Sequence, residues 1–275
     1  MRYDINVEDV EYNRHGGTPL LMRLYRPQGT GPFPIMVELH GGAWCRSDRL
    51  ADVVIHEPLA RSGVIVASLD FRQPPVAPYP ASFQDIHYGI RWLKARATEL
   101  GSRPDMVGSM GNSSGGHQAM LLGMRPFDAR YGALPLAGGS PAADATVRCV
   151  IMCSPVIDPI GRYHYAKELK AKGQPYPALV DEVLPCHDAY WQTEAAMAEG
   201  CPGAGARAGA KRCSSRPCST CRGPRTWRIP GPTSIASSRR IERRAAWSTS
   251  SCSRARGRGS SCARPAHRPP IAPST

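Results

Sequence analysis

The chain has 275 residues, a length that one large α/β domain can occupy. Its formal net charge of +13 would suit a nucleic-acid binder, but residues 1–200 carry 19 Lys and Arg against 21 Asp and Glu, and residues 201–275 carry 16 against one acid, Glu242. The basic excess therefore lies in the last quarter, and the composition excludes general nucleic-acid binding by the first 200 residues.

The beginning of the chain and its cysteines indicate a compartment. Met1-Arg2-Tyr3-Asp4 leads into alternating polar residues rather than the apolar run of a signal peptide. No apolar run approaches the ~18 residues of a membrane span. The cysteines before residue 200 are flanked by apolar residues and are predicted to be reduced thiols in the core: Cys45, Cys149, Cys153 and Cys186. We therefore expect a cytoplasmic protein without a membrane span.

The first third of the chain predicts strands. Residues 3–12 and 20–26 form a hairpin through His15-Gly16-Gly17, and after a Pro/Gly loop residues 35–39 form a buried strand. A second run rich in β-branched residues covers 64–69.

A helix is predicted next, because apolar residues recur every three or four positions from Phe83 to Leu100. Ser82 is the expected N-cap of this helix, and Gly101 is expected to stop it.

The most informative stretch is Gly111-Asn112-Ser113-Ser114-Gly115, which follows an apolar run and precedes helix-forming residues. A Gly-x-Ser-x-Gly sequence between a strand and a helix is typical of a nucleophile elbow, in which glycines two residues to either side avoid Cβ clashes. The turn lifts the Ser113 hydroxyl above the sheet, next to the positive end of the following helix. Ser113 is thus the predicted nucleophile, although a Gly/Ser-rich loop can also give this pentapeptide by chance.

A second motif agrees with the first. The strand at 35–39 runs directly into His40-Gly41-Gly42-Ala43-Trp44. A glycine pair at this place allows backbone N–H groups to turn toward a developing oxyanion.

The rest of the first 200 residues completes an alternating pattern. Residues 147–153 predict another strand, and residues 156–192, which contain prolines and aromatic residues, are expected to form an insertion or lid over the site. Buried strands that alternate with helices predict a mostly parallel sheet covered on both faces.

Together these motifs resemble the α/β-hydrolase fold, and within it the hormone-sensitive-lipase-like esterases, over residues 10–200. The resemblance rests on the His40 and Gly111 motifs above and on Asp70-Phe71-Arg72, Pro78-Tyr79-Pro80-Ala81 and Asp85. It implies an α/β-hydrolase domain over residues 1–200 and a serine ester hydrolase acting on a small-molecule ester. It further implies Ser113 as nucleophile and an oxyanion hole made by the N–H groups of Gly41, Gly42 and Ser114.

The sequence departs from the family pattern in two ways. Ala43-Trp44 stands where many lipases have a further glycine, and some small-ester hydrolases and arylformamidase-like relatives look like this sequence instead. Amide or formamide hydrolysis is therefore an alternative. In the family, Asp or Glu and then His follow the nucleophile. Here no Asp follows Asp188, and the one later histidine is His267, so we expect an impaired enzyme.

The other polar residues offer no evident replacement. His117 follows the elbow along its helix, and His40 is expected to shape the loop. Five residues of the expected lid are predicted to lie on its surface or pack within it: Asp158, His164, Asp181, His187 and Asp188.

The composition of residues 201–275 is unlike that of a folded sheet. The segment has no Leu, Val, Phe, Tyr or Asp and is dominated by Arg, Ser, Pro, Cys, Gly and Ala. This low-complexity composition is typical of disorder, and also of a GC-rich gene read in a shifted frame. Cys218-Ser219-Thr220-Cys221 lacks a second ligand pair, so we expect no metal site and no cofactor. We expect no specific nucleic-acid partner, and the alternative from another class is a non-catalytic binding protein with a basic tail.

Overall fold

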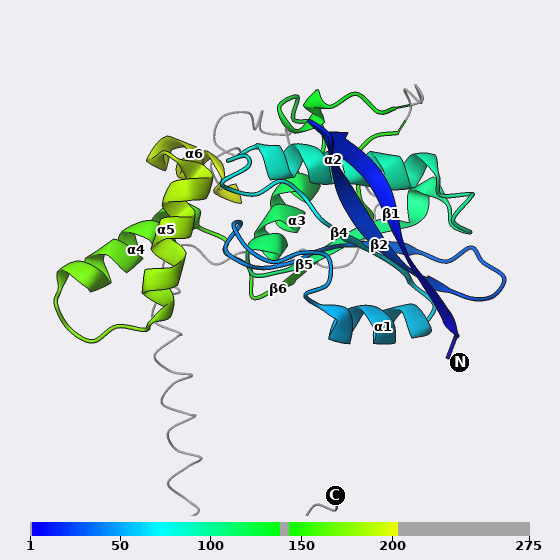
Figure 1. Cartoon of the computed structure of the whole chain (residues 1–275), viewed down its shortest axis with the longest axis horizontal. Coiled ribbons are helices and arrows are strands. Elements are labelled where there is room, and N and C mark those ends of the chain that lie inside the picture. Colours follow the sequence, from blue (N-terminus) through cyan, green and yellow to red (C-terminus); the bar gives the residue numbers. More distant parts are fainter. Residues whose placement is uncertain (1, 138–142, 203–275) are drawn as a thin grey trace, which may run out of the picture. The chain divides into compact units, whose positions relative to one another are not determined.

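The computed structural model describes residues 2–137 and 143–202, and these residues build one six-stranded sheet with helices on both of its faces (Figure 1). The strands are β1 (Ile5–His15), β2 (Thr18–Pro27), β3 (Ile35–Leu39), β4 (Ile65–Leu69), β5 (Val107–Asn112) and β6 (Val150–Cys153). The helices are α1 (Val53–Arg61), α2 (Ala81–Ala95), α3 (Ser114–Met124), α4 (Pro159–Ala171), α5 (Leu179–Trp191) and α6 (Glu194–Glu199), with 3-10 turns at Pro104–Met106 and Tyr131–Ala133.

The strand order is β1-β2-β4-β3-β5-β6. The β1–β2 and β2–β4 pairs are antiparallel, whereas β4–β3, β3–β5 and β5–β6 are parallel. The predicted mostly parallel α/β sheet is therefore confirmed. The three parallel pairs bring the carboxyl ends of β3 and β5 to the same edge of the sheet, where both predicted motifs begin.

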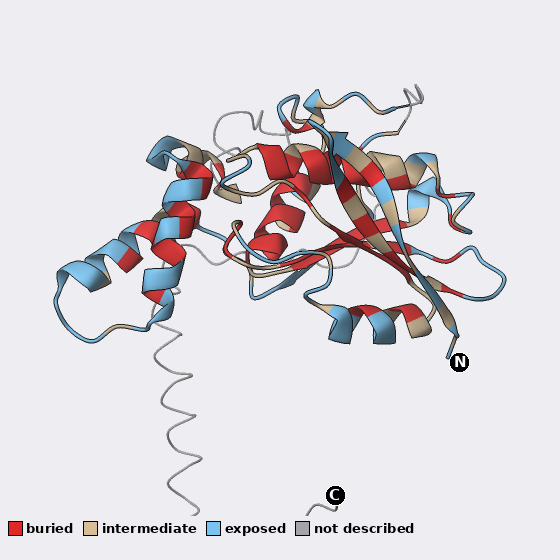
Figure 2. Ribbon diagram, viewed as in Figure 1, coloured by how far each residue is buried: buried red, intermediate tan, exposed pale blue. Residues whose placement is uncertain are grey.

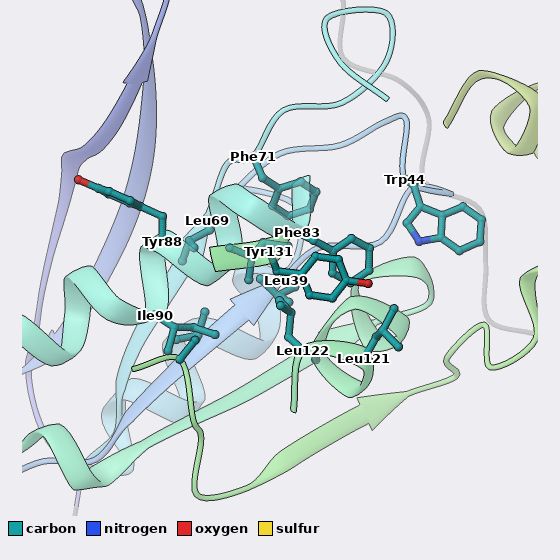
Figure 3. Packing of buried hydrophobic residues seen from close by; sticks show 14 of the residues in the cluster. Leu39, Trp44, Leu69, Phe71, Phe83, Tyr88, Ile90, Leu121, Leu122 and Tyr131 are labelled. Atoms are coloured by element: carbon teal, nitrogen blue, oxygen red, sulfur yellow. The ribbon is translucent and has the colours of Figure 1, made fainter. Parts of the chain in front are cut away.

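The hydrophobic core lies mainly between the sheet and the helices α2 and α3, while α1 covers the opposite face (Figures 1 and 2). Figure 3 shows Phe83 of α2 and Tyr131 stacked beside Leu39 and Leu122, and the ring centroids of Phe83 and Tyr131 are 4.9 Å apart. All five residues of β3 are wholly or mostly buried, and the five residues of β4 are all buried. Such burial on both faces explains why the central strands are apolar runs.

The predicted helix at 82–101 is confirmed in its first part and corrected at both ends. It begins at Ala81 with Pro80 at the N-cap position, so Ser82 lies within the first turn, where its buried hydroxyl is 2.6 Å from the Tyr190 hydroxyl. The α-helix ends at Ala95, and the chain continues through turns as far as Gly101.

The last strand is shorter than predicted and differs in burial. β6 starts at Val150 rather than at residue 147, although the backbone already pairs with β5 before it: Arg148 N donates to the Val107 carbonyl at 2.8 Å, and Ser109 N donates to the Cys149 carbonyl at 3.0 Å. The prediction of core thiols is wrong for Cys149 and Cys153, which are exposed because no strand covers β6 on its outer side within the described residues. Cys186 is buried and Cys45 is partly buried, as predicted.

The structure bears only in part on three further predictions, which concern the lid, the tail and a membrane span. Residues 156–192 hold α4 and α5, but a lid function for them stays a prediction. The predictions about the tail concern residues that, from 203 onward, lie outside the described part of the chain. No helix in the described residues is long and apolar enough to cross a membrane.

Candidate active site

Ser113 lies in a sharp turn between the end of β5 and the first residue of α3. Its backbone has φ 54° and ψ −115°, a conformation that costs a non-glycine residue about 1–3 kcal/mol. The surrounding backbone holds it there: Ser113 N donates to the Cys153 carbonyl at 2.8 Å, and the Ser113 carbonyl accepts from His117 N at 3.1 Å. The structure thus gives Ser113 the strained turn that the sequence predicts for a nucleophile.

The two flanking glycines are required by close backbone packing. A Cβ atom on Gly111 would lie 2.4 Å from the carbonyl carbon of Gly115, and one on Gly115 would lie 1.9 Å from the Leu39 carbonyl oxygen. Real Cβ atoms do not approach backbone so closely, so the turn tolerates no side chain at either position.

The loop after β3 packs against this turn. A Cβ atom on Gly41 would lie 3.4 Å from the Ser113 Cβ, which places the Gly41 backbone in contact with the serine. Gly42 has φ +105°, and its carbonyl accepts from Cys45 N and Arg46 N at 3.1 Å each. Ser114 is the first residue of α3, so its N–H group has no acceptor within the helix. The structure therefore brings the predicted residues Gly41, Gly42 and Ser114 around Ser113.

A cleft of about 690 Å³ opens at this turn. Gly42 and Ser113 line it on the sheet side, and residues from the segment after β6 and from α4 and α5 line the other walls. The walls are mostly apolar, with a few charged residues among them. The lining residues besides Gly42 and Ser113 are Ala43, Arg46, Ser154, Pro155, Val156, Ile157, Asp158, Gly161, Arg162, Tyr165, Leu179 and Val183.

His117 is a core histidine. It is fully buried in α3, its Nε2 donates to the Gly200 carbonyl at 2.8 Å, and its Nδ1 accepts from Trp44 Nε1 at 3.3 Å. Burial lowers the pKa of His117 to about 4, against the smaller opposing effect of the Gly200 carbonyl. Both ring nitrogens are occupied, so His117 is not available to take a proton from Ser113.

His40 makes the contacts expected of a residue that shapes the loop after β3. Its Nδ1 donates to the Gly41 carbonyl at 2.8 Å, and its ring stacks on Phe71 with the centroids 4.3 Å apart. The same contacts fix the direction of the Gly41 peptide.

The five polar residues of the 156–192 segment have local partners. Asp158 caps α4 by accepting from Gly161 N at 2.9 Å, and His187 Nδ1 donates to the Val183 carbonyl at 2.8 Å. The remaining partners are Glu194 for His164, Lys170 for Asp181 and the Tyr163 hydroxyl for Asp188. None of these residues hydrogen-bonds to Ser113, and no histidine of the described ranges lines the cleft.

A buried polar cluster was missed by the sequence analysis. Glu38 of β3 is 2% exposed, its Oε2 lies 2.9 Å from His56 Nε2, and it accepts from Ser68 Oγ at 2.7 Å. The pKa of nearby Asp52 is raised, mainly by burial and next by the charge of Glu38. The signal in the sequence that could have indicated this cluster is Glu38 itself, a charged residue inside the apolar run 35–39. The cluster lies among buried strands and does not line the cleft.

Two of the residues that carry the family resemblance, Arg72 and Asp85, form an ion pair. Arg72 donates from Nε and Nη2 to the two carboxylate oxygens of Asp85 at 2.9 Å, and this carboxylate is fully buried. The pair connects the loop after β4 to α2. In the described part of the chain, no three His, Cys, Asp or Glu side chains gather in a way that could hold a metal ion.

Comparison with known proteins gives the family and the fold of the chain. Residues 22–180 match the family described as BD-FAE. The carboxylesterase NlhH of Mycobacterium tuberculosis is 31% identical over 125 residues, which are 43% of this chain and 38% of NlhH. The probable carboxylic ester hydrolase LipM of the same organism is 29% identical over 126 residues, 45% of this chain and 29% of LipM. The matches thus span roughly a third of these curated relatives.

Solved structures show the same fold. Esterase LipW from Mycobacterium marinum superposes with a TM-score of 0.56 and 25% identity, over 72% of this chain and 58% of LipW. A hyperthermophilic esterase from Pyrobaculum calidifontis superposes with a TM-score of 0.54 and 22% identity, over 71% of this chain and 60% of the esterase. The described residues therefore have an α/β-hydrolase fold.

Proposed function

The chain belongs to the BD-FAE family and shares the α/β-hydrolase fold of known esterases, and on this premise we propose that it is a serine hydrolase of small carboxylic esters. The observation that carries the proposal is the backbone of Ser113, held at φ 54° between two glycines at the edge of an apolar cleft. Backbone strain of this kind is concentrated at functional sites, and at Ser113 it coincides with the close approach of Gly41 and with the cleft.

In the proposed reaction, a base takes the proton of the Ser113 hydroxyl while Oγ attacks the acyl carbon. The carbonyl electrons move to oxygen, and the N–H groups of Gly41, Gly42 and Ser114 stabilise the oxyanion. The tetrahedral intermediate then expels the alcohol, which takes the proton. Water attacks the acyl-serine in the same way and releases the carboxylic acid. This route requires neither a metal nor a cofactor.

We propose in addition that the chain with this sequence is a poor catalyst. No histidine lines the cleft within residues 2–137 and 143–202, no Asp follows Asp188, and His267 is the one later histidine. Loss of a triad member lowers kcat by about 10⁴-fold for the acid and about 10⁶-fold for the base, while the oxyanion hole alone retains part of the acceleration. We therefore expect a slow hydrolysis that depends on Ser113 and lacks an efficient base.

Imidazole rescue tests both statements. The full chain and its Ser113→Ala variant are assayed with p-nitrophenyl butyrate at increasing imidazole concentration. Free imidazole supplies the base, so the Ser113-dependent rate, taken as the difference between the two proteins, is expected to rise at least about tenfold. Subtracting the variant removes the direct attack of imidazole on the ester. Equal rates for both proteins at every imidazole concentration would show that Ser113 is not a nucleophile.

His267→Ala is the control for the missing base. It should leave the Ser113-dependent rate without imidazole unchanged, and a clear loss would identify His267 as the base and contradict the proposed impairment. p-Nitrobutyranilide in the same assay distinguishes ester from amide hydrolysis, and a faster Ser113-dependent cleavage of the anilide would favour the amidase alternative.

A further inference from the structure

Arg162 lines the cleft beside Ser113 and has no counterion among the described residues. Arg162 belongs to the first turns of α4 and is half-buried. Its backbone N donates to the Asp158 carbonyl at 3.0 Å, but within the described residues its guanidinium forms no hydrogen bond or ion pair.

The nearby carboxylates are engaged elsewhere. Asp158 lines the same cleft, but its Oδ1 accepts from Gly161 N at 2.9 Å and from Cys201 Sγ at 3.2 Å. The other cation of the cleft, Arg46, is exposed and pairs with Glu182 at 3.2 Å. Outside the described residues the sequence holds one acidic side chain, Glu242. No carboxylate of the described residues pairs with Arg162, and the rest of the sequence offers a single acidic side chain.

A half-buried guanidinium without an anion is unfavourable. Burial lowers the pKa of Arg162, which reflects the cost of removing the charged group from water. An anionic ligand in the cleft would remove that cost and could accept two parallel N–H hydrogen bonds from the planar guanidinium.

The other walls of the cleft indicate the part of the ligand that would lie between its anionic group and the reacting carbonyl. Val156, Leu179 and Val183 line the space that Ser113 and Arg162 share. Their side chains favour a short aliphatic chain, with polar groups only at its two ends.

We infer that Arg162 is a specificity-determining residue that selects esters bearing a carboxylate a few carbon atoms from the scissile carbonyl. This inference rests on the proposed ester hydrolysis and names its substrate class. An acyl chain that ends in a carboxylate would place its carbonyl at Ser113 and its charge at Arg162.

The test measures binding, so that it does not depend on catalysis. Glutaranilic acid, whose amide resists cleavage and whose chain ends in a carboxylate, is compared with neutral N-phenylpentanamide by titration calorimetry on the full chain. We expect glutaranilic acid to bind at least about tenfold more tightly than the neutral anilide, because its carboxylate forms a charge-assisted hydrogen bond with Arg162. Arg162→Gln should abolish this preference, and Arg162→Lys should restore part of it.

Lys167→Gln is the matched control, because it removes an exposed charge of α4 that does not line the cleft. It should retain the preference of the unchanged protein. The inference is overturned if the unchanged protein shows no preference, if neither anilide binds, or if Arg46→Gln rather than Arg162→Gln removes the preference. A preference that depends on Arg162 in a protein without Ser113-dependent hydrolysis would support the anion site while rejecting the proposed catalysis.

Discussion

β5 and β6 are neighbours in the sheet, but they differ in how they are supported. In β5 every residue except the last is buried, because β3 and β6 flank it and α3 packs over it. In β6 three of the four residues are exposed, and Ile151 and Met152 remain 45% and 44% accessible. The turn at Ser113 therefore follows an enclosed strand, whereas the next strand forms the edge of the described sheet.

This difference bears on the chemistry. The close packing at Gly111 and Gly115 that shapes the turn at Ser113 belongs to the enclosed part of the sheet, and the edge strand β6 adds the Cys153 carbonyl, which accepts from Ser113 N at 2.8 Å. In the family that the sequence resembles, the acid and the base follow later strands, beyond the position of β6. The described residues thus contain the strands that support the proposed nucleophile, but they do not include the later strands that would support a base. Three tests of this contrast follow, beginning with the largest expected effect.

Gly115→Ala should disrupt the enclosed side most severely. The new Cβ would lie 1.9 Å from the Leu39 carbonyl oxygen and 2.5 Å from that of His40, and neither backbone atom can move without shifting β3. We expect the free energy of unfolding to fall by more than about 3 kcal/mol, or the cooperative transition to vanish. Urea unfolding followed by circular dichroism measures this.

Gly132→Ala is the control for that experiment, since its Cβ would meet His87 Cε1 at an ordinary 3.4 Å. An unchanged urea midpoint in Gly115→Ala would contradict the close contact between the elbow and β3.

A smaller effect is expected from the protonation of His117, which links α3 to Trp44 and Gly200. Its pKa of about 4 in the folded chain lies below the ordinary value of about 6.5 in the unfolded chain. The unfolded chain therefore binds the proton more readily, and stability that is fully present above about pH 6.5 is lost as the pH falls to 4. The loss attributable to His117 is about 3 kcal/mol.

Urea unfolding at pH 7 and at pH 4.5 measures this dependence. His117→Gln is expected to be less stable at pH 7 but to lose less stability on acidification than the unchanged protein. His164→Gln, which alters an exposed histidine paired with Glu194, should retain the full dependence. An undiminished dependence in His117→Gln would show that another group titrates.

The sequence predicted the elements whose signals are local. The strand at 35–39 matches β3 at both ends, and the strand at 64–69 differs from β4 by one residue. α3 begins directly after Ser113, as the elbow requires. In these segments apolar runs and glycines report the backbone conformation directly, and this includes most of the candidate site.

The features that the sequence did not predict depend on contacts between residues far apart in the chain. α1 was not predicted, because Val53-Val54-Ile55 favour strands and Pro58 disfavours a helix interior, while contacts with β2 and β4 stabilise the helix. The partners of His117 come from residues 44 and 200, far apart in the chain. Arg162 has no sequence motif, since its importance depends on what lies opposite it in the cleft.

The smallest expected effect on stability is at the edge of the sheet. It tests the contrast between the buried β5 and the exposed β6 within one pair of neighbouring residues. Met110 of β5 and Ile151 of β6 are partners in the parallel register, but Met110 is 6% exposed and Ile151 is 45% exposed. Ile151→Thr keeps a β-branched side chain and should lower the free energy of unfolding by less than about 1 kcal/mol. Met110→Thr removes buried contacts and should cost about 2 kcal/mol or more in the same urea titration. If the two substitutions cost the same, Ile151 is covered in solution, and the outer edge of β6 is then occupied by another segment or another molecule.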